Sequence, residues 1–173
     1  MALLEIVEAP DPRLQTVCDP VERIDAELLR LLDQMHETMR AAPGIGLAAP
    51  QVGRLSRACV IDLGDQADME PLFLINPEVT WRSAEIVVEE EGCLSLPEHF
   101  GQVARAAKVR VGYRDRAGLP QEVDGEGLLS RCLQHEIDHL NGVLFTDHLS
   151  ALKRTLIFRK LNKAQRARSR ANA

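Results

Sequence analysis

The clearest hydrophobic pattern in the chain lies at residues 25–42, where apolar residues recur every three or four positions. This spacing places them on one face and predicts an amphipathic helix. Asp25 can cap its first turn, and Pro43 followed by Gly44 ends it. The predicted apolar stripe consists of Leu28, Leu31, Leu32, Met35 and Met39.

Two further helices are predicted toward the end of the chain. The first spans residues 127–140 and stops at Asn141-Gly142, a common helix-ending pair. The second spans roughly residues 150–167. The small residues of 44–53, GIGLAAPQVG, instead predict a loop.

Strands are predicted between the first helix and the last two. Apolar and β-branched residues gather in 57–63, 72–75, 79–90 and 103–113, and a short strand is expected near Glu122-Val123. Strands thus fill the middle of the chain and helices lie toward its ends. This order predicts an α+β fold rather than an alternating βαβ fold.

The length of 173 residues, without a repeat or a low-complexity linker, predicts one domain. The 45% hydrophobic and 27% charged residues are typical of a soluble globular protein. The chain contains no run of about 18 apolar residues, so a membrane span is not expected. The N-terminus lacks the pattern of a secretory signal. The cysteines are too scattered for a disulfide scaffold and favour a reduced, cytoplasmic protein; they are Cys18, Cys59, Cys93 and Cys132.

Charge is distributed unevenly along the chain. Residues 151–173 contain eight Lys or Arg and no acid. The other 150 residues carry 13 of the 21 bases and all 26 acids, a balance of −13. An acidic body with a basic end favours an anionic partner for that end, such as RNA; a solvated terminal helix without a partner explains the charge equally well.

Residues 135–139, His-Glu-Ile-Asp-His, carry the strongest chemical signal. Two histidines four positions apart lie on one face of a helix and can share one metal ion. Glu136 can then reach a metal-bound water, a combination that activates water near neutral pH. The motif predicts a metal-dependent hydrolase; the alternative is a surface helix with two incidental histidines.

A catalytic metal usually has three protein ligands and one water, so a third ligand is needed. The extended metalloprotease patterns fail, because position 145 is Phe and no glutamate follows Glu136. Cysteine is the natural upstream candidate. Spacing favours Cys93, which follows a predicted strand and a glycine that permits a bend, over Cys132, which would crowd three ligands onto one helix.

Three blocks together resemble the signature motifs of peptide deformylase: GIGLAAPQ at 44–51, EGCLS at 91–95 and QHEIDH at 134–139. They stand in the family's order, and the likeness extends over nearly all of residues 1–173, most closely to the bacterial type 1 form. The resemblance implies antiparallel sheets packed around the central helix that carries HEIDH, with an N-terminal and a C-terminal helix. It also implies removal of the formyl group from the N-terminal formylmethionine of nascent polypeptides, with release of formate.

The resemblance assigns the metal site. Cys93, His135 and His139 match the family's ligands, and Glu136 matches the acid and base that moves the proton from water to the leaving amine. The implied cofactor is one divalent ion, Fe²⁺ in the cell, for which Zn²⁺ or Ni²⁺ can substitute. The implied partners are N-formylmethionyl nascent peptides and, as a hypothesis, the ribosome through basic residues 151–173. Neither DNA nor a membrane is expected.

The resemblance also places the substrate. Gln51 matches the glutamine whose amide polarises the formyl oxygen, and the backbone N–H of Leu94 matches a second donor. Gly46 matches a glycine whose backbone contacts the substrate. The residues expected to line the substrate site are Ile45, Gly46, Glu91, Arg131 and Cys132.

Four side chains near these motifs leave questions for the structure. Phe100 lies where several members carry arginine, which leaves open how the peptide backbone is contacted there. The alkyl stem of Arg131 is expected to line the methionine pocket while its head reaches water. Glu91 either orients a ligand, lines that pocket or merely belongs to the acidic run 89–91. For Asp138, which lies off the ligand face, a structural role is favoured.

Overall fold

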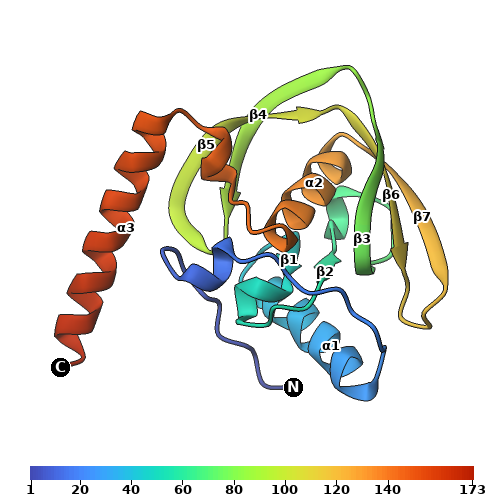
Figure 1. Cartoon of the computed structure of the whole chain (residues 1–173), viewed down its shortest axis with the longest axis horizontal. Coiled ribbons are helices and arrows are strands. Elements are labelled where there is room, and N and C mark those ends of the chain that lie inside the picture. Colours follow the sequence, from blue (N-terminus) through green and yellow to red (C-terminus); the bar gives the residue numbers. More distant parts are fainter.

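Helix α2 (Leu128–Leu140), which carries the His-Glu-Ile-Asp-His motif, lies at the centre of the molecule (Figure 1). In the computed structural model, which describes residues 1–173, two antiparallel sheets surround this helix. The predicted α+β architecture, with a helix toward each end of the chain, is confirmed. None of the helices combines the length and the hydropathy that a membrane span requires.

The larger sheet has five strands in the order β1-β2-β3-β6-β7, and each neighbouring pair is antiparallel. Apolar side chains of this sheet, among them Leu74 and Val111, share one core with Leu133 and Ile137 of α2. The sheet therefore fixes the position of the helix. Its strands are β1 (Gly46–Ala48), β2 (Ala58–Ile61), β3 (Leu72–Arg82), β6 (Lys108–Arg114) and β7 (Pro120–Glu126).

Two predicted strand boundaries in this region are wrong. The strand predicted to stop at Ile75 continues as β3, because a register shift after Ile75 accommodates the left-handed backbone of Asn76 at φ 51°. The strand predicted over 103–113 is two strands, because the chain leaves the smaller sheet at Ala107 and enters the larger one at Lys108. Side chains alternate in both halves, so the sequence pattern does not mark the change of sheet.

The smaller sheet is a hairpin of β4 (Ile86–Cys93) and β5 (Leu96–Ala106). A register shift between Gly92 and Cys93 interrupts the regular pairing, and Cys93 then pairs with Leu96 beside the hairpin turn. Residues 83–85 separate β4 from β3, so the strand predicted over 79–90 is also divided. The hairpin thus presents Cys93 at its turn.

The segment 44–53, predicted as a loop, contains β1 and a single 3-10 turn at Ala49–Val52. Pro50 lies in the first positions of this turn, and Gly53 ends it with a φ of 76°. Its residues are small, so no alternation of large apolar and polar side chains indicated a strand. The turn places Gln51 in the interior, where it is 1% exposed.

Helix α1 (Ala26–Ala41) begins as predicted, because the side chain of Asp25 accepts a hydrogen bond from the Leu28 N–H at 2.9 Å. Its apolar face packs against β1 and β2, while Leu31 is only half-buried. The fully buried members of the predicted stripe are Leu28, Leu32, Met35 and Met39.

Helix α3 (Ala151–Ala171) stands at one side of the molecule and ends far from α2 (Figure 1). Ser150 caps its first turn, and the helix continues beyond residue 167, where it was predicted to end. Leu161 is its only buried residue. Arg168 pairs with Glu8, which ties the far half of the helix to the N-terminal segment.

Candidate active site

Helix α2 is held in one orientation by both apolar and polar contacts. Ile137 and Leu140 pack into the core beneath the larger sheet. On another side, Ser130 Oγ and Gln134 Nε2 donate hydrogen bonds to the carbonyl of Ala106, at 2.9 and 3.0 Å. These contacts fix which side chains of the motif face the hairpin.

Three candidate metal ligands meet where α2 faces the hairpin turn. The Sγ of Cys93 lies 3.3 Å from Nε2 of His139, which lies 3.2 Å from Nε2 of His135. All three ligand atoms lie within 4.8 Å of one another. Burial lowers the pKa of His139, so its imidazole is neutral, the form that binds metals. A thiolate with two imidazoles suits zinc or ferrous iron, so this group fits a metal site.

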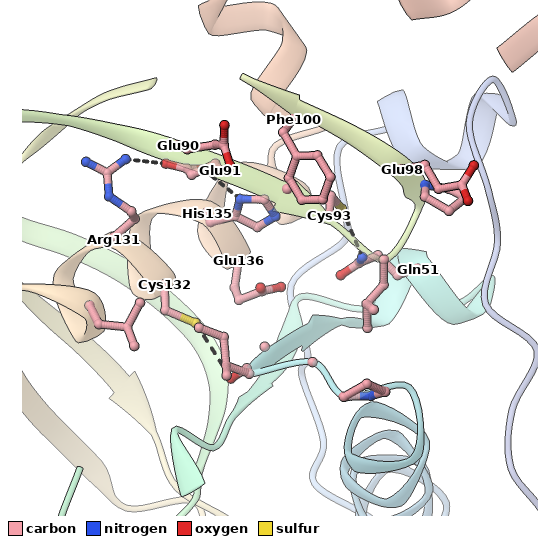
Figure 2. A pocket seen from close by; sticks show the side chains of 18 residues that line it. Gln51, Glu90, Glu91, Cys93, Glu98, Phe100, Arg131, Cys132, His135 and Glu136 are labelled. Atoms are coloured by element: carbon pink, nitrogen blue, oxygen red, sulfur yellow. Dashed lines mark hydrogen bonds and ion pairs between the residues drawn. The ribbon is translucent and has the colours of Figure 1, made fainter. Parts of the chain in front are cut away.

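Glu91 of β4 orients one of these imidazoles. Its Oε1 lies 2.9 Å from Nδ1 of His135 (Figure 2). Burial acts to raise the pKa of Glu91, but hydrogen bonds from His135 and Arg105 outweigh burial and hold the pKa well below its usual value. An ionised carboxylate only accepts, so Nδ1 of His135 carries a proton directed at Glu91, and Nε2 is the nitrogen that faces His139. This geometry favours the orienting role of Glu91.

Two buried arginines hold the carboxylate of Glu91. Arg105 donates to both of its oxygens at 2.9 Å and also pairs with Asp138. Arg131 donates to Oε2 of Glu91 at 2.6 Å. The expectation that the head of Arg131 reaches water is wrong, because this residue is 7% exposed and bonded to acids and backbone carbonyls. Asp138 contacts Arg105 and His148 rather than a ligand histidine, in line with a structural role.

Glu136 lies beside this group as a buried carboxylate. It is 3% exposed, and its Oε2 has no hydrogen-bond partner. Burial raises its pKa to about 7. A Cβ atom at Gly46 would collide with Oε1 of Glu136, so only glycine lets the β1 backbone approach this carboxylate. Glu136 can therefore exchange a proton near neutral pH.

Gln51 lies on the other side of Cys93. Its Oε1 accepts a hydrogen bond from the Ala48 N–H at 2.9 Å, which fixes the orientation of the amide. Its Nε2 lies 3.4 Å from Sγ of Cys93 and 3.2 Å from Oγ of Ser95. The amide group of Gln51 thus points its N–H donors toward the metal-ligand group (Figure 2).

These groups line a cleft of about 480 Å³, which contains every residue that the sequence placed at the substrate. Cys132 lies in the wall, where burial raises the pKa of its thiol well above normal, and its Sγ donates weakly to the carbonyl of Ile45 at 3.7 Å. The structure brings Cys93, not Cys132, beside the two histidines. Phe100 is 60% exposed at the rim (Figure 2).

The sequence reasoning did not identify Arg105 and Ser95. Arg105 is 5% exposed in β5, at a position that faces inward like Val103. A basic residue at an inward position of a strand is a signal for a buried ion pair, but it became visible only once the strand limits were known. Ser95 follows the EGCL residues, and no pattern marks its hydroxyl as a partner of Gln51.

Comparisons with known proteins agree with this geometry. The family model of polypeptide deformylase matches residues 3–155. A peptide deformylase of Methylocella silvestris is 52% identical over 168 residues, which cover 95% of this chain and 86% of the relative. The crystal structure of a peptide deformylase from Legionella pneumophila has a TM-score of 0.89 and 47% identity, and the match covers 98% of this chain and 99% of that one. One from Ehrlichia chaffeensis in complex with actinonin has a TM-score of 0.92 and 40% identity, covering 96% and 99%. The predicted family is thus confirmed, and the chain belongs to the polypeptide deformylases.

Proposed function

We propose that this chain removes the formyl group from the N-terminal formylmethionine of nascent polypeptides, with Glu136 as the acid and base. The reaction is that of the family. One observation carries the assignment of Glu136: it is a buried carboxylate, with a pKa raised to about 7, in a cleft beside a group of three metal-binding side chains.

Cys93, His135 and His139 would hold one divalent metal ion, ferrous iron in the cell, with zinc or nickel able to replace it. Such an ion supplies a water molecule whose pKa is lowered to about 7. Three protein ligands, rather than four, are the usual complement of a catalytic metal site. This supports a hydrolytic site over a closed structural one.

Glu136 would take a proton from the attacking water and deliver it to the leaving amine. General acid–base catalysis of this kind contributes roughly 10²- to 10⁴-fold to a rate. A pKa of about 7 suits both steps, because the carboxyl group is then populated in both forms near neutral pH. The close approach of Gly46 keeps the carboxylate at the wall of the cleft.

Two donors would stabilise the negative charge that develops on the formyl oxygen. The amide of Gln51 is one, since its own oxygen is engaged by Ala48 and its Nε2 faces Cys93. The backbone N–H of Leu94 is the other, because it makes no hydrogen bond within the chain. Loss of one such donor typically costs about 3–4 kcal/mol.

The methionine side chain would enter the end of the cleft that Leu128, Arg131 and Cys132 line. Apolar atoms of Leu128 and Cys132 there suit a thioether chain. Phe100 lies at the rim, where the residues that follow methionine would leave the cleft. An exposed ring at this place would replace the charged contact of the arginine-bearing relatives by an apolar one.

The basic helix α3 would dock on an anionic partner, for which we propose the ribosome. The helix stands at one side of the molecule (Figure 1). Most of its basic side chains are exposed. Arg154 and Arg168 are engaged by Asp147 and Glu8, which leaves the other six bases of residues 151–173 outside these ion pairs.

Formyl-Met-Ala and acetyl-Met-Ala test the proposed reaction as a pair. Release of formate from the first peptide, with both Met-Ala bonds left intact, is expected. Cleavage of the Met-Ala bond would instead identify a metallopeptidase. Release of acetate at a rate similar to formate would contradict specificity for the formyl group.

A further inference from the structure

His148 is the solvent-facing end of a chain of polar contacts that reaches the candidate metal ligands. Its side chain is 34% exposed and lies at the end of the 3-10 turn Phe145–His148. Phe145 of this turn is buried in one apolar cluster with Val103 of β5, which fixes the turn against the smaller sheet. The reaction proposed above gives the imidazole of His148 no role.

Asp138 of α2 is the first link in this chain of contacts. Oδ2 of its carboxylate lies 2.8 Å from Nε2 of His148 and 2.5 Å from Nη1 of Arg105. A carboxylate only accepts, so both nitrogens donate to the same oxygen. The side chain of Asp138 is 23% exposed. Without His148, this carboxylate would keep Arg105 as its one side-chain partner and could turn toward water.

Arg105 of β5 extends the chain of contacts inward. Its buried guanidinium lies between two acids, Asp138 of α2 and Glu91 of β4. Nη2 of Arg105 donates at 2.9 Å to Oε1 of Glu91, the same oxygen that lies 2.9 Å from Nδ1 of His135. Arg131 holds only the other oxygen of Glu91, Oε2. The oxygen that orients His135 is therefore fixed by Arg105, and Arg105 is fixed in turn by Asp138.

We propose that His148 is a positioning residue for the metal site, because it holds Asp138 against Arg105. This contact restricts the carboxylate of Glu91 and, through it, the ring of His135. A surface imidazole thus supports a metal ligand that it does not touch. The inference rests on the proposed function, because it takes His135 to be a metal ligand.

The test uses cobalt(II) as the probe, because the visible spectrum of bound cobalt reports the geometry of its ligands. His148→Ala should alter the spectrum of the cobalt-loaded protein. The rate at which a chelator removes the cobalt should rise roughly three- to tenfold, less than the 10- to 100-fold typical of direct partners of a ligand, because His148 acts through intermediates. In the active protein, kcat for formyl-Met-Ala should fall while KM stays unchanged, since His148 does not line the cleft.

Two further variants give the rescue and the matched control. His148→Gln keeps a side-chain N–H that can donate to Asp138, so it should restore most of the cobalt spectrum and most of the resistance to the chelator. Arg154→Ala removes a surface ion pair with Asp147, a residue of the same 3-10 turn, and Arg154 contacts neither Asp138 nor Arg105. This control should leave the spectrum, the chelation rate and kcat unchanged.

Thermal unfolding of the metal-free variants separates positioning from stability. If His148→Ala lowers Tm but keeps the cobalt spectrum and chelation rate of the unaltered protein, His148 is only structural and the proposal is overturned. Equal changes in His148→Ala and His148→Gln would also overturn it, because the donor to Asp138 would not matter. Cobalt binding and formate release by the unaltered protein test the proposed function separately, and failure of both would refute that function together with this inference.

Discussion

Helices α2 and α3 differ sharply in how their side chains are constrained. Nine of the thirteen residues of α2 are buried. Its polar side chains form hydrogen bonds with Ala106, Glu91 and Arg105. Helix α3 is longer, with 21 residues, but buries only Leu161. The buried polar groups of α2 are held in place around a carboxylate oxygen of Glu136 that has no hydrogen-bond partner, whereas most bases of α3 are exposed and available to a partner.

Of the tests that distinguish the roles of the two helices, metal removal should have the largest effect on formate release. Chelation is expected to abolish formate release, because both candidate ligand histidines lie on α2, and to leave α3 unaffected. The iron-loaded protein should lose activity in air, since iron beside the Cys93 thiolate exposes both to oxidation. Time courses of formate release in air and under nitrogen, for iron- and zinc-loaded protein, measure this. Equal and lasting activity of both forms in air would count against an iron enzyme.

Glu136→Ala should lower kcat roughly 10²- to 10⁴-fold while metal content stays near that of the unaltered protein. The reason is that Glu136 is the proposed proton carrier but is not among the three candidate ligand side chains. Formate release with metal analysis of the same sample checks both parts. Glu136→Gln keeps the shape of the side chain and should be equally inactive; substantial activity in it would remove the proton-transfer role.

Gln51→Ala should lower kcat by about 10²- to 10³-fold, the usual effect of losing one oxyanion donor. Because the amide also accepts from Ala48, a structural effect must be separated from a catalytic one. Ser95→Ala removes the other partner of Nε2 without removing a proposed oxyanion donor, so its effect on kcat should be much smaller. Comparable losses in the two variants would mean that Gln51 acts by packing alone.

Neutralising exposed bases of α3 should have the smallest effect on catalysis. Replacing Arg159, Lys160, Lys163 and Arg166 by glutamine is expected to leave kcat/KM on formyl-Met-Ala unchanged. Binding to ribosomes in a sedimentation assay should weaken and become less dependent on salt, because fewer phosphates are neutralised. Substituting Arg154, which is already paired with Asp147, is the matched control. Unaltered ribosome binding would exclude this helix as the docking element.

The sequence predicted those features that depend on local spacing. The cap at Asp25, the buried face of α1 and the pairing of two histidines on α2 all follow from the helical repeat. Spacing favoured Cys93 over Cys132 as the third ligand, and the family resemblance assigned Cys93. Each of these features can be read within a few residues of the chain, or from a motif of fixed composition.

The features that the sequence did not yield depend on contacts between distant segments. The break at Ala107 is a change of sheet that an alternating pattern cannot show. The burial of Arg131 depends on carbonyls of two strands that lie 28 and 44 positions away in the chain. Likewise, Arg105 is recognised as a partner of Glu91 only when β4 and β5 are aligned. Such long-range pairings carry no local signature.

The hairpin turn and α2 contribute candidate ligand atoms from residues 46 positions apart in the sequence, Cys93 and His139. A cation bound to both would close a long loop of the chain, much as a cross-link does, and would restrict the unfolded ensemble more than the native fold. Loss of the ion would therefore lower resistance to heat and proteases, so that metal supply governs the lifetime of the polypeptide as well as its turnover.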